Sequence, residues 1–467
     1  MFKFSIIISL LSLSFSEPFN GLTLITSTNN NNGNSTMDFS HLIDNDGNIL
    51  NEWRHDTPPT SIAYLAPDSI LYVPCKKNNS TNNTLRQPIG GRFKKMDWDG
   101  NILWDFSLPE EICTPHHDIA ILPNGNILAI CSEVRTPQEV ASKGKIVINP
   151  NVPLTLDMII EIMPIGEDNA EIVWEWRFWD RLIQNIDPDL DNFNSISNNP
   201  QQLDINCLAD LTGFTMYDWN HCNSISYNKD LKQIILSSRH MNEIYIIEHT
   251  DSNTDAAGSI GGVYNKGGDF LYRWGNPRNY GMNASQKLFN PHGVNWIESN
   301  SPGEGNILVF NNDFFADSLS AVVEITPPIN DFGDYLFDNI YGPETFYWSY
   351  QSNFYSAVQS GAYRLPNGNT LITSSRDRNI FEITTSNSIA WVYNGPLETA
   401  RALKYPINYF TDDMLIGDFN NDSLLNVLDV VILVNNILYN NSEQTYDLNN
   451  DQISNVIDIV ILVNLIL

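Results

Sequence analysis

The sequence predicts an all-β fold, a β-propeller, followed by a small α-helical domain. Three observations lead to this fold class. A turn of Asp or Asn with Gly, followed by a short apolar run, recurs along the chain; short segments with aromatic endings recur beside it; and the C-terminal segment contains two copies of a different, acidic pattern. Many short strands at near-regular spacing, with few helical periods, indicate an all-β array. Such degenerate repeats are more typical of propeller blades than of a sandwich.

The first sixteen residues have the pattern of a secretory signal peptide. Lys3 precedes an apolar run from Phe4 to Phe15, and the small residues Ser14 and Ser16 suit a cleavage site. This run is short for a membrane span, and a buried first strand is the alternative interpretation. We therefore expect residues 1–16 to be removed, leaving no transmembrane span, and a protein that is secreted, periplasmic or held at the cell surface.

The composition limits the classes of partner. At 467 residues with 42% hydrophobic content, the chain can bury a large core and is long enough for two or more domains. Its 55 acidic residues against 25 basic ones give a net charge of −30, which excludes nucleic acid because binding a phosphate backbone needs a basic face. Five cysteines fit an oxidising compartment without forming a dense disulfide framework. At least one is unpaired in a monomer, and our candidate is Cys222.

Two phrases mark the strands of the propeller, which we place at residues 17–412. The turn phrase, as in Asp46-Gly-Asn-Ile-Leu50, also occurs at 99–103, 124–128, 305–308 and 367–371. Asp-Gly and Asn-Gly favour hairpins because both residues tolerate positive φ. The aromatic phrase occurs at 49–53, 102–106, 172–176, 270–274 and 389–393, and its alternation suits strands with one buried face. A central channel would then collect loop residues from distant blades.

Five polar clusters between Pro115 and Arg376 contain five of the eight histidines. They are His116-His117-Asp118, Asn220-His221-Cys222-Asn223, Arg239-His240, Asn290-Pro291-His292-Gly293 and Arg376-Asp377. A single histidine near a strand end is usually a hydrogen-bonding residue, and we interpret His249 in this way. Convergent polar groups in the channel of a repeat fold instead mark a site. Imidazole, amide and guanidinium groups at this spacing are suited to binding one anion.

Three of these stretches carry a family resemblance. The segment from Pro115 to Gly125, the run Asp218-Trp-Asn-His-Cys-Asn-Ser-Ile225 and the run Ser237-Ser-Arg-His240 resemble the bacterial arylsulfate sulfotransferases. The resemblance implies a six-bladed propeller that moves a sulfuryl group from a phenolic sulfate ester to an acceptor phenol. It also implies a ping-pong mechanism through a sulfohistidine that needs no nucleotide cofactor, and thus independence of PAPS.

The same resemblance assigns roles to residues of this chain. His292 falls where the family keeps its nucleophile, and a neutral imidazole is a competent nucleophile near neutral pH. His117 corresponds to the first site histidine, with the adjacent His116 as the competing choice. The other residues placed around the sulfuryl oxygens are His221, Asn223 and Arg239. Fixed donors of this kind stabilise the charge that develops on the oxygens. His117 or His221 would act as acid and base, and which histidine has which task stays open.

Substrate-binding residues are predicted around this set. Arg376 lies at the position in another blade that is equivalent to that of Arg239, so we predict that it contacts the substrate. The alternative is a salt bridge with Asp377 or with a neighbouring blade. Tyr217 and Trp219 are the candidates for binding the aryl ring because they lie close to His221 in the sequence. We also count His116 as a substrate-binding residue. Further aromatic candidates are Trp348, Phe354 and Tyr355.

Residues 413–467 contain two loop-helix patterns 29 residues apart. Oxygen side chains occupy loop positions 1, 3, 5, 9 and 12 of each pattern, as a hard cation such as calcium requires. The predicted ligands are Asp418, Asn420, Asp422, Asn426 and Asp429 in the first loop and Asp447, Asn449, Asp451, Asn455 and Asp458 in the second. Two solvated turns that each cap a helix are the alternative. The pair resembles a type I dockerin, which implies a cohesin-like partner; an intramolecular or cell-surface role is equally open.

The leading functional hypothesis is a secreted arylsulfate sulfotransferase with calcium in its tail and no cofactor for catalysis. Its partners would be a phenolic sulfate donor and a phenol acceptor. A second hypothesis is a non-catalytic propeller that binds sulfated or anionic glycans and is tethered by its calcium-binding tail. A third is a quinoprotein-like dehydrogenase, because such propellers share tryptophan-rich repeats; the sequence has no clear quinone-and-calcium constellation within the propeller.

Overall fold

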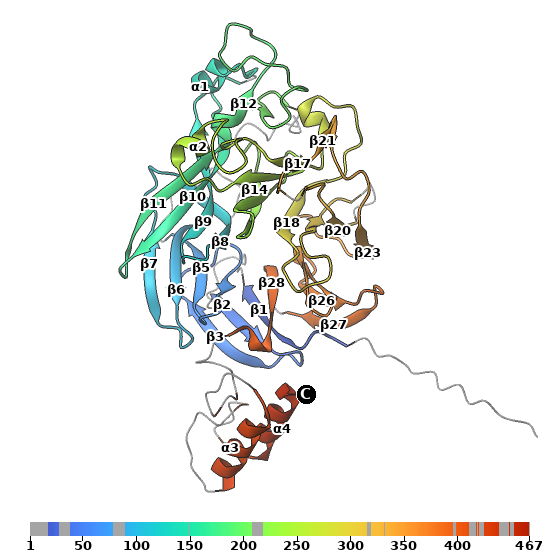
Figure 1. Ribbon diagram of the computed structural model, residues 1–467. Coiled ribbons are helices and arrows are strands. Elements are labelled where there is room, and N and C mark those ends of the chain that lie inside the picture. Colours follow the sequence, from blue (N-terminus) through green and yellow to red (C-terminus); the bar gives the residue numbers. More distant parts are fainter. Residues whose placement is uncertain are drawn as a thin grey trace, which may run out of the picture.

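The computed structural model describes residues 17–27, 38–77, 89–147, 149–207, 218–314, 319–330, 332–395, 398–410, 417, 419, 425–438, 448 and 453–466. Within these residues, six four-stranded antiparallel sheets surround a central axis (Figure 1). The predicted all-β class and the six blades are thus confirmed. The predicted signal peptide, residues 1–16, lies outside the described residues.

The first three blades come from the N-terminal half and the last strand of the propeller. Each is given from the channel outwards. Blade one is β28 (Thr399–Pro406), β1 (Gly21–Ser27), β2 (Asp38–Ile43) and β3 (Ile49–His55). Blade two is β4 (Tyr64–Leu65), β5 (Leu71–Lys76), β6 (Gly91–Met96) and β7 (Ile102–Ser107). Blade three is β8 (Thr114–Ile121), β9 (Ile127–Arg135), β10 (Leu154–Ile165) and β11 (Asn169–Arg177).

The other three blades follow in chain order. Blade four is β14 (Cys222–Asn228), β15 (Gln233–Ser238), β16 (Glu243–Glu248) and β17 (Tyr272–Trp274). Blade five is β18 (Pro291–Trp296), β19 (Ile307–Asn311), β20 (Ala321–Ile325) and β23 (Trp348–Gln351). Blade six is β24 (Gly361–Arg364), β25 (Thr370–Ser374), β26 (Asn379–Ile383) and β27 (Ile389–Asn394).

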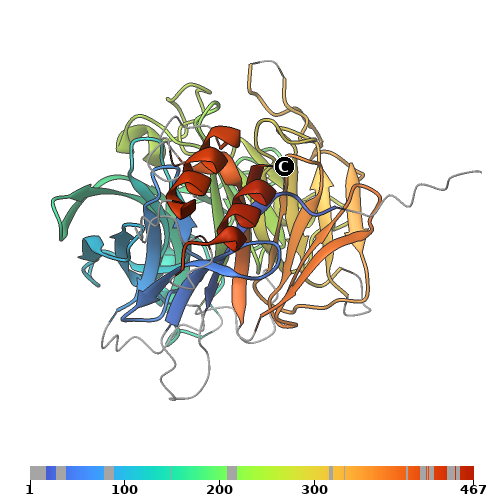
Figure 2. The ribbon, with the colours of Figure 1, turned by 90° about the horizontal axis from the view of Figure 1, so that it is seen from below.

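Short elements decorate the blades, and two longer helices follow them. The short ones are α1 (Pro137–Ser142), η1 (Phe178–Arg181), β12 (Leu182–Ile183), β13 (Leu203–Asp204), α2 (Asn253–Ala257), η2 (Pro277–Tyr280), β21 (Phe337–Asp338), β22 (Ile340–Tyr341) and η3 (Ile407–Tyr409). The helices α3 (Val427–Leu438) and α4 (Val456–Ile466) pack together near the C-terminus (Figure 2). No helix among the described residues has both the length and the apolar character needed to cross a membrane.

The ring is closed by pairing the two ends of the propeller segment. β1 is antiparallel to β28, with Thr23 opposite Lys404 and Leu24 opposite Leu403. Blade one therefore contains the first and the last strand. The inner strands of successive blades then face one another around the channel, as β8, β14, β18 and β24 do.

The predicted turn phrase forms hairpins in five of the six blades. Gly47 connects β2 to β3 with φ of 84°, and Gly100 connects β6 to β7 with the same value. The equivalent turns contain Gly125, Gly305 and Gly368, also at positive φ. A residue with a Cβ atom adopts this conformation at a cost, which explains the recurring glycine.

An indole hydrogen bond connects most blades to the next one. Nε1 of Trp53 in blade one donates to the backbone carbonyl of Asp97 in blade two at 2.8 Å. The corresponding pairs are Trp104 with Asn169, Trp174 with Thr250, Trp274 with Pro343 and Trp391 with Asn45. All five tryptophans belong to the aromatic phrase of the sequence. That repeat therefore encodes contacts between blades as well as strands.

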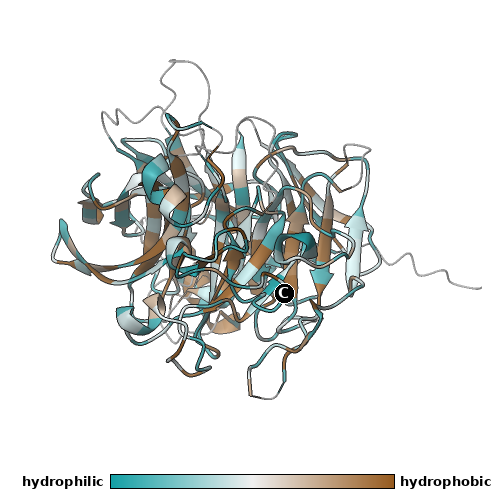
Figure 3. Cartoon of the chain, turned by 90° about the horizontal axis from the view of Figure 1, so that it is seen from above, coloured by the Kyte–Doolittle hydropathy of each residue, from teal (hydrophilic) through white to brown (hydrophobic). Residues whose placement is uncertain are grey.

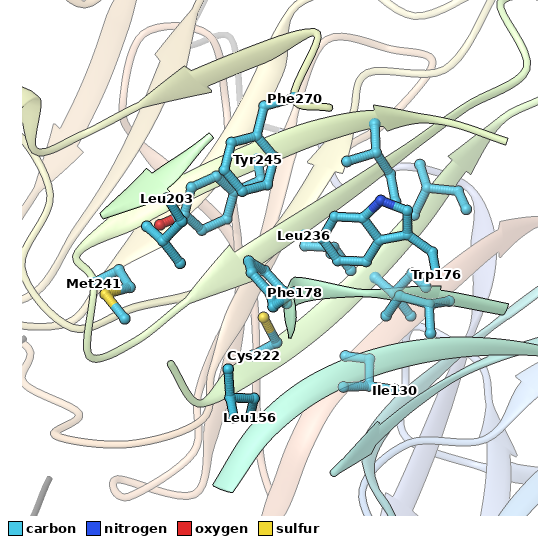
Figure 4. Packing of buried hydrophobic residues seen from close by; sticks show 14 of the residues in the cluster. Ile130, Leu156, Trp176, Phe178, Leu203, Cys222, Leu236, Met241, Tyr245 and Phe270 are labelled. Atoms are coloured by element: carbon cyan, nitrogen blue, oxygen red, sulfur yellow. The ribbon is translucent and has the colours of Figure 1, made fainter. Parts of the chain in front are cut away.

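The core consists of six apolar clusters, one at each interface between blades. The largest lies between blades three and four, where Trp176, Phe178, Tyr245 and Phe270 pack against aliphatic side chains (Figure 4). Figure 3 shows the hydrophobic colouring concentrated in the strands. All five cysteines are buried free thiols. The face-to-face packing of sheets holds the inner strands, and hence the channel residues, in place.

Candidate active site in the propeller channel

The three predicted catalytic histidines lie at the starts of three inner strands, and therefore at the same end of the channel. His117 lies near the start of β8, His221 immediately precedes β14, and His292 is the second residue of β18. The pairing register shifts at each place: between Pro115 and Ile119, between Cys222 and Ser224, and between His292 and Asn295. Such bulges re-aim side chains and are common beside active sites.

Two of these histidines have an unusual backbone conformation. The φ angles of His117 and His221 are 55° and 49°. A non-glycine residue in this left-handed region costs on the order of 1–3 kcal/mol and persists only where the surrounding structure enforces it. The imidazole rings of His117 and His221 meet edge to face, with centroids 4.8 Å apart. Strained backbone at the edges of blades three and four therefore brings two site histidines into contact.

His292 has a fixed pattern of hydrogen bonds at one ring nitrogen. Its Nδ1 lies 3.0 Å from the carbonyl oxygen of Asn290 and 2.8 Å from Oδ1 of Asn312. The amide nitrogen of Asn312 donates to the carbonyls of Ser356 and Gln359, which fixes the orientation of that amide. Both neighbours of Nδ1 are therefore acceptors, so Nδ1 carries the hydrogen and Nε2 keeps a lone pair.

The environment also keeps His292 neutral. Its burial, followed by the positive charge of Arg239, lowers the pKa of His292 to about 3. The side chain is only 4% exposed. A neutral imidazole with a lone pair on Nε2 is the form that a nucleophile requires. Asn312, which fixes this tautomer, was not predicted as a site residue. The only feature of the sequence that could have indicated it is the polar run that follows β19.

His117 belongs to a buried chain of three polar side chains. Nδ1 of His117 lies 2.8 Å from Nδ1 of His116, whose Nε2 lies 3.1 Å from Oδ1 of Asp157. Burial, and then the charges of neighbouring histidines, hold the pKa of His117 well below its usual range. His116 lies behind His117 with a side chain closed to solvent. This placement makes His116 a support for His117, which does not fit the predicted contact between His116 and substrate. The assignment of His117 as the first site histidine stays a prediction.

Below the histidines, Asp118 joins four inner strands. Its carboxylate accepts hydrogen bonds from the hydroxyl of Tyr64, the guanidinium of Arg401 and the backbone N–H of Ile225 at 2.7, 2.6 and 3.0 Å. These partners lie on β4, β28 and β14, and Asp118 itself on β8. The buried ion pair thus ties the inner strands of four blades together. Neither Tyr64 nor Arg401 was predicted from sequence.

Asn223 connects the strand of His221 to the strand of His292. Its amide nitrogen donates to the carbonyl of Pro291 at 2.8 Å, and its oxygen accepts from the hydroxyl of Ser237 at 2.6 Å. One amide hydrogen remains for another acceptor. Asn223 is therefore both a fixed link between blades four and five and a donor beside His292.

Arg239 has guanidinium capacity left for an anion. Its Nε is buried and has no hydrogen-bond partner among the described residues, while one terminal nitrogen donates to Nε2 of His240 at 3.3 Å. Burial lowers the pKa of Arg239 despite the nearby carboxylates of Asp313 and Asp218, yet a guanidinium stays charged. An incompletely bonded, half-buried arginine close to a neutral histidine is suited to binding anionic oxygens.

Asp218, His221 and His240 form a further cluster at this end of the channel. Oδ2 of Asp218 lies 2.5 Å from Nδ1 of His221, and the backbone carbonyl of Asp218 accepts from Nδ1 of His240 at 2.8 Å. The residue types are those of a metal site. However, 2.5 Å is the length of a strong hydrogen bond and is too short for two atoms that share a metal ion at about 2 Å each.

The other predicted substrate-binding residues are Trp219, Arg376 and Tyr217. Trp219 is buried in the core between blades three and four, 2% exposed, with Lys145 over its ring; a role in binding the aryl ring does not fit that position. Arg376 has a half-exposed side chain paired with Glu398 at 3.4 Å, so the salt bridge joins it to the next strand connection instead of to Asp377. Tyr217 lies outside the described residues.

Among the other aromatic candidates, Tyr355 is the one beside the site. It is 37% exposed, and its hydroxyl donates to Asp313, one of the carboxylates whose charge acts on Arg239. Phe354 is buried in the core between blades five and six, and Trp348 stacks under Arg364. Tyr355 is therefore the described aromatic side chain best placed to contact an aryl group near Arg239.

The C-terminal loops are described only in part. Of the predicted calcium ligands, Asn426, Asp429, Asn455 and Asp458 are described; the others, Asp418, Asn420, Asp422, Asp447, Asn449 and Asp451, lie outside the described residues. Asp429 accepts the backbone N–H groups of Phe419 and Asn426, and Asp458 accepts the equivalent pair in the second loop. The two loops thus share one capping arrangement.

The channel of the six-bladed propeller gathers a fixed neutral histidine, two further histidines, an amide and an incompletely bonded arginine, which are the groups suited to binding and transferring an anionic group. The chain belongs to the arylsulfotransferase (ASST) family, whose sequence profile matches residues 16–392. Family membership supports a sulfotransferase that acts on phenolic substrates.

Several solved structures resemble the chain at low sequence identity, and no curated protein matches the chain. A protein of unknown function from Bacteroides caccae is 13% identical, with 82% of this chain and 98% of that chain covered and a TM-score of 0.45. A streptogramin B lyase is 14% identical over 83% and 86%, with a TM-score of 0.34. The virginiamycin B lyase of Staphylococcus aureus is 12% identical over 83% and 88%, with a TM-score of 0.35. At these scores the matches carry no functional argument.

Proposed function

We propose that the protein transfers a sulfuryl group from a phenolic sulfate ester to an acceptor phenol by a ping-pong mechanism through a sulfated His292. The observation that carries this proposal is the fixed tautomer of His292. Hydrogen bonds to Asn290 and Asn312 occupy Nδ1, and burial keeps the ring neutral. The lone pair on Nε2 can therefore attack sulfur without prior loss of a proton.

The sulfuryl oxygens need donors while charge develops on them. Arg239 has a buried Nε without a partner among the described residues, and Asn223 has one amide hydrogen left. Preorganised donors aimed at developing charge commonly make the largest catalytic contribution. By analogy with phosphoryl transfer, a planar guanidinium binds two of the oxygens while the amide binds a third. The sulfate ester supplies the group that is transferred, so the proposed reaction needs no PAPS.

The proposal extends to export and to the C-terminal segment. The signal-like pattern of residues 1–16 supports a secreted, periplasmic or surface-held enzyme. We also propose that the two loop-helix units bind calcium and attach the enzyme to a cohesin-like or cell-surface partner. Both oxygens of Asp429 accept a backbone N–H, and the described side chains at positions 9 and 12 of the two loops are amides and carboxylates, whose oxygens are the ligands that calcium takes. The described ligands therefore fit calcium, which would fix the loops ahead of α3 and α4.

Two-substrate kinetics test the enzymatic proposal. With 4-nitrophenyl sulfate as donor and phenol as acceptor, we expect sulfated phenol and parallel lines in double-reciprocal plots, which are typical of ping-pong exchange. His292→Asn should remove the activity. Intersecting lines would contradict the covalent intermediate. Binding of aryl sulfate without turnover would instead support a non-catalytic propeller that holds sulfated ligands.

A further inference from the structure

We propose that Asp218 and His221 form a dyad that carries the proton of the phenolic oxygen in both half-reactions. His221 would be the catalytic acid and base, and Asp218 its positioning residue. This inference rests on the proposed function and adds to it the location of the proton. An aryl sulfate with a weakly acidic phenol needs such a donor, because its phenolate is a poor leaving group unless it is protonated as it departs.

The contact between the two residues has the geometry of an acid-base dyad. Asp218 Oδ2 lies 2.5 Å from Nδ1 of His221. An ionised carboxylate only accepts hydrogen bonds, so Nδ1 of His221 carries a hydrogen and Nε2 is the nitrogen that exchanges a proton. The carboxylate also stabilises the imidazolium that exists when both nitrogens are protonated. The left-handed backbone of His221 holds this ring against that of His117 at the channel end.

The other two site histidines are poorly suited to carrying the proton. Amide and carbonyl oxygens occupy Nδ1 of His292, and its pKa is lowered to about 3 by burial. His117 is buried against two histidines, and the charge of Arg401 contributes to holding its pKa far below the usual value. Among the described residues, neither is hydrogen-bonded to a carboxylate. Of the three histidines, only His221 is hydrogen-bonded to one.

Asp218 remains ionised although it is mostly buried. Burial alone would raise the pKa of Asp218, but attraction to His221 and the hydrogen bond between them outweigh it and lower that pKa to about 2. His240 holds the same residue from the other side, since Nδ1 of His240 donates to the Asp218 carbonyl. The guanidinium of Arg239 donates to Nε2 of His240, and the backbone N–H of Arg239 donates to the carbonyl of His221. The dyad and the sulfuryl-binding arginine are therefore connected.

The proton that leaves His221 in the first half-reaction returns to it in the second. In the first, the bond between sulfur and the donor's phenolic oxygen breaks as Nε2 of His292 bonds to sulfur; the oxygen keeps the electron pair and takes the proton from Nε2 of His221. In the second, the acceptor's oxygen attacks sulfur, the electron pair of the nitrogen–sulfur bond returns to His292, and the acceptor's proton passes to His221. The enzyme ends in its starting state without another reactant.

The test compares donors whose phenols differ in acidity. Asp218→Asn keeps the shape of the side chain and removes its charge. With phenyl sulfate, we expect kcat/KM to fall about 10²-fold to 10⁴-fold, the usual contribution of general acid catalysis. With 4-nitrophenyl sulfate, whose more acidic phenol leaves without a proton, we expect a fall of about tenfold or less. The control is Glu161→Gln, because Glu161 contacts His249 at 2.9 Å outside the channel; it should leave both donors unaffected.

Equal losses with both donors would assign Asp218 a purely structural role and overturn the proposal, as would unchanged activity with phenyl sulfate. If Asp218→Asn does not fold by circular dichroism, His221→Gln is compared in the same way and must show the same dependence on the donor. The wild-type enzyme separates the two proposals. Failure of the wild type to transfer sulfuryl groups contradicts the proposed function, whereas an active wild type with donor-independent losses contradicts only the dyad.

Discussion

Oδ1 of Asn312 lies 2.8 Å from Nδ1 of His292, and the Asn312 amide nitrogen is bonded to two backbone carbonyls. The amide therefore cannot turn over to present its N–H groups to the imidazole. As a result, His292 has one allowed tautomer when neutral, with its lone pair on Nε2. The reactivity of this histidine depends on a residue that never contacts the substrate in the proposed mechanism.

Asn312→Leu should slow the sulfation of His292. Leucine has a similar size but cannot accept the hydrogen of Nδ1, so the ring loses one constraint on its tautomer and orientation. We expect the rate of 4-nitrophenol release in the first turnover to fall about tenfold to a hundredfold, the loss typical when a partner that orients a metal-bound imidazole is removed. The matched control is Asn306→Leu in the same blade, where the amide bonds to Glu324. Equal rates for the wild type and Asn312→Leu would remove Asn312 from the mechanism.

The stability of the protein should fall in mild acid because of buried neutral histidines. His55 is an example outside the site: burial, and then the charge of Lys94, lower its pKa from 6.5 to about 3. Below the pKa of the unfolded chain, His55 binds a proton in the unfolded state but not in the folded state. The free energy of unfolding therefore decreases as the pH falls, by about 2 kcal/mol for one such histidine near pH 5.

Urea unfolding of the wild type and His55→Gln near neutral pH and near pH 5 checks this sign. The acid-induced loss in unfolding free energy should be smaller in the variant. His240 and His292 have lowered pKa values too, so the variant keeps part of the dependence. A variant that loses more stability in acid than the wild type would contradict the assignment of His55 as neutral.

Removing Arg401 should destabilise the whole ring. Arg401→Met leaves the buried carboxylate of Asp118 without its counterion at the point where four inner strands meet. Loss of one partner of a buried ion pair costs about 3–5 kcal/mol, measurable by chemical unfolding. Arg401→Met combined with Asp118→Asn should recover much of this loss. The control is Arg54→Met, at an exposed ion pair, which should change the free energy of unfolding by no more than about 0.5 kcal/mol. Similar losses in Arg401→Met and Arg54→Met would refute the special role of Asp118.

Calcium should protect the C-terminal helices. If the two loops coordinate calcium, hydrogen exchange of the amides in α3 and α4 of the full-length protein should slow when calcium is added and accelerate with chelator. The propeller strands should change little and act as an internal control. Combining Asp429→Asn with Asp458→Asn should remove the response. Exchange rates unaffected by calcium in the wild type would leave the two loops as helix caps alone.

Local patterns in the sequence predicted much of the fold. The Gly turns and the tryptophans of the aromatic phrase encode hairpins and contacts between neighbouring blades, and both signals depend on residues close together in the chain. The same is true of His221 and Arg239, which share one hairpin. The prediction of Trp219 as a ring-binding residue does not fit its position in the core between two blades, because closeness to His221 in the sequence does not tell which side chains face the channel.

The supporting residues could not be read from the sequence. Asp157 supports His117 through His116, and Arg401 reaches Asp118 only because the last strand of the propeller closes the ring beside the first. Asn312 lies in a polar run without a distinctive motif. Closure and bulges bring these side chains together over long separations in the chain, so their roles follow from the folded geometry and not from spacing.

The most direct test of the account is mass spectrometry of the protein after brief exposure to 4-nitrophenyl sulfate. If His292 is the nucleophile, the peptide that contains it gains about 80 Da, the mass of one sulfuryl group held covalently, and loses it again on addition of phenol. His292→Asn should show no increase. An adduct located on His117, His221 or any other residue, or turnover without any adduct, would contradict the assignment of His292 as the nucleophile.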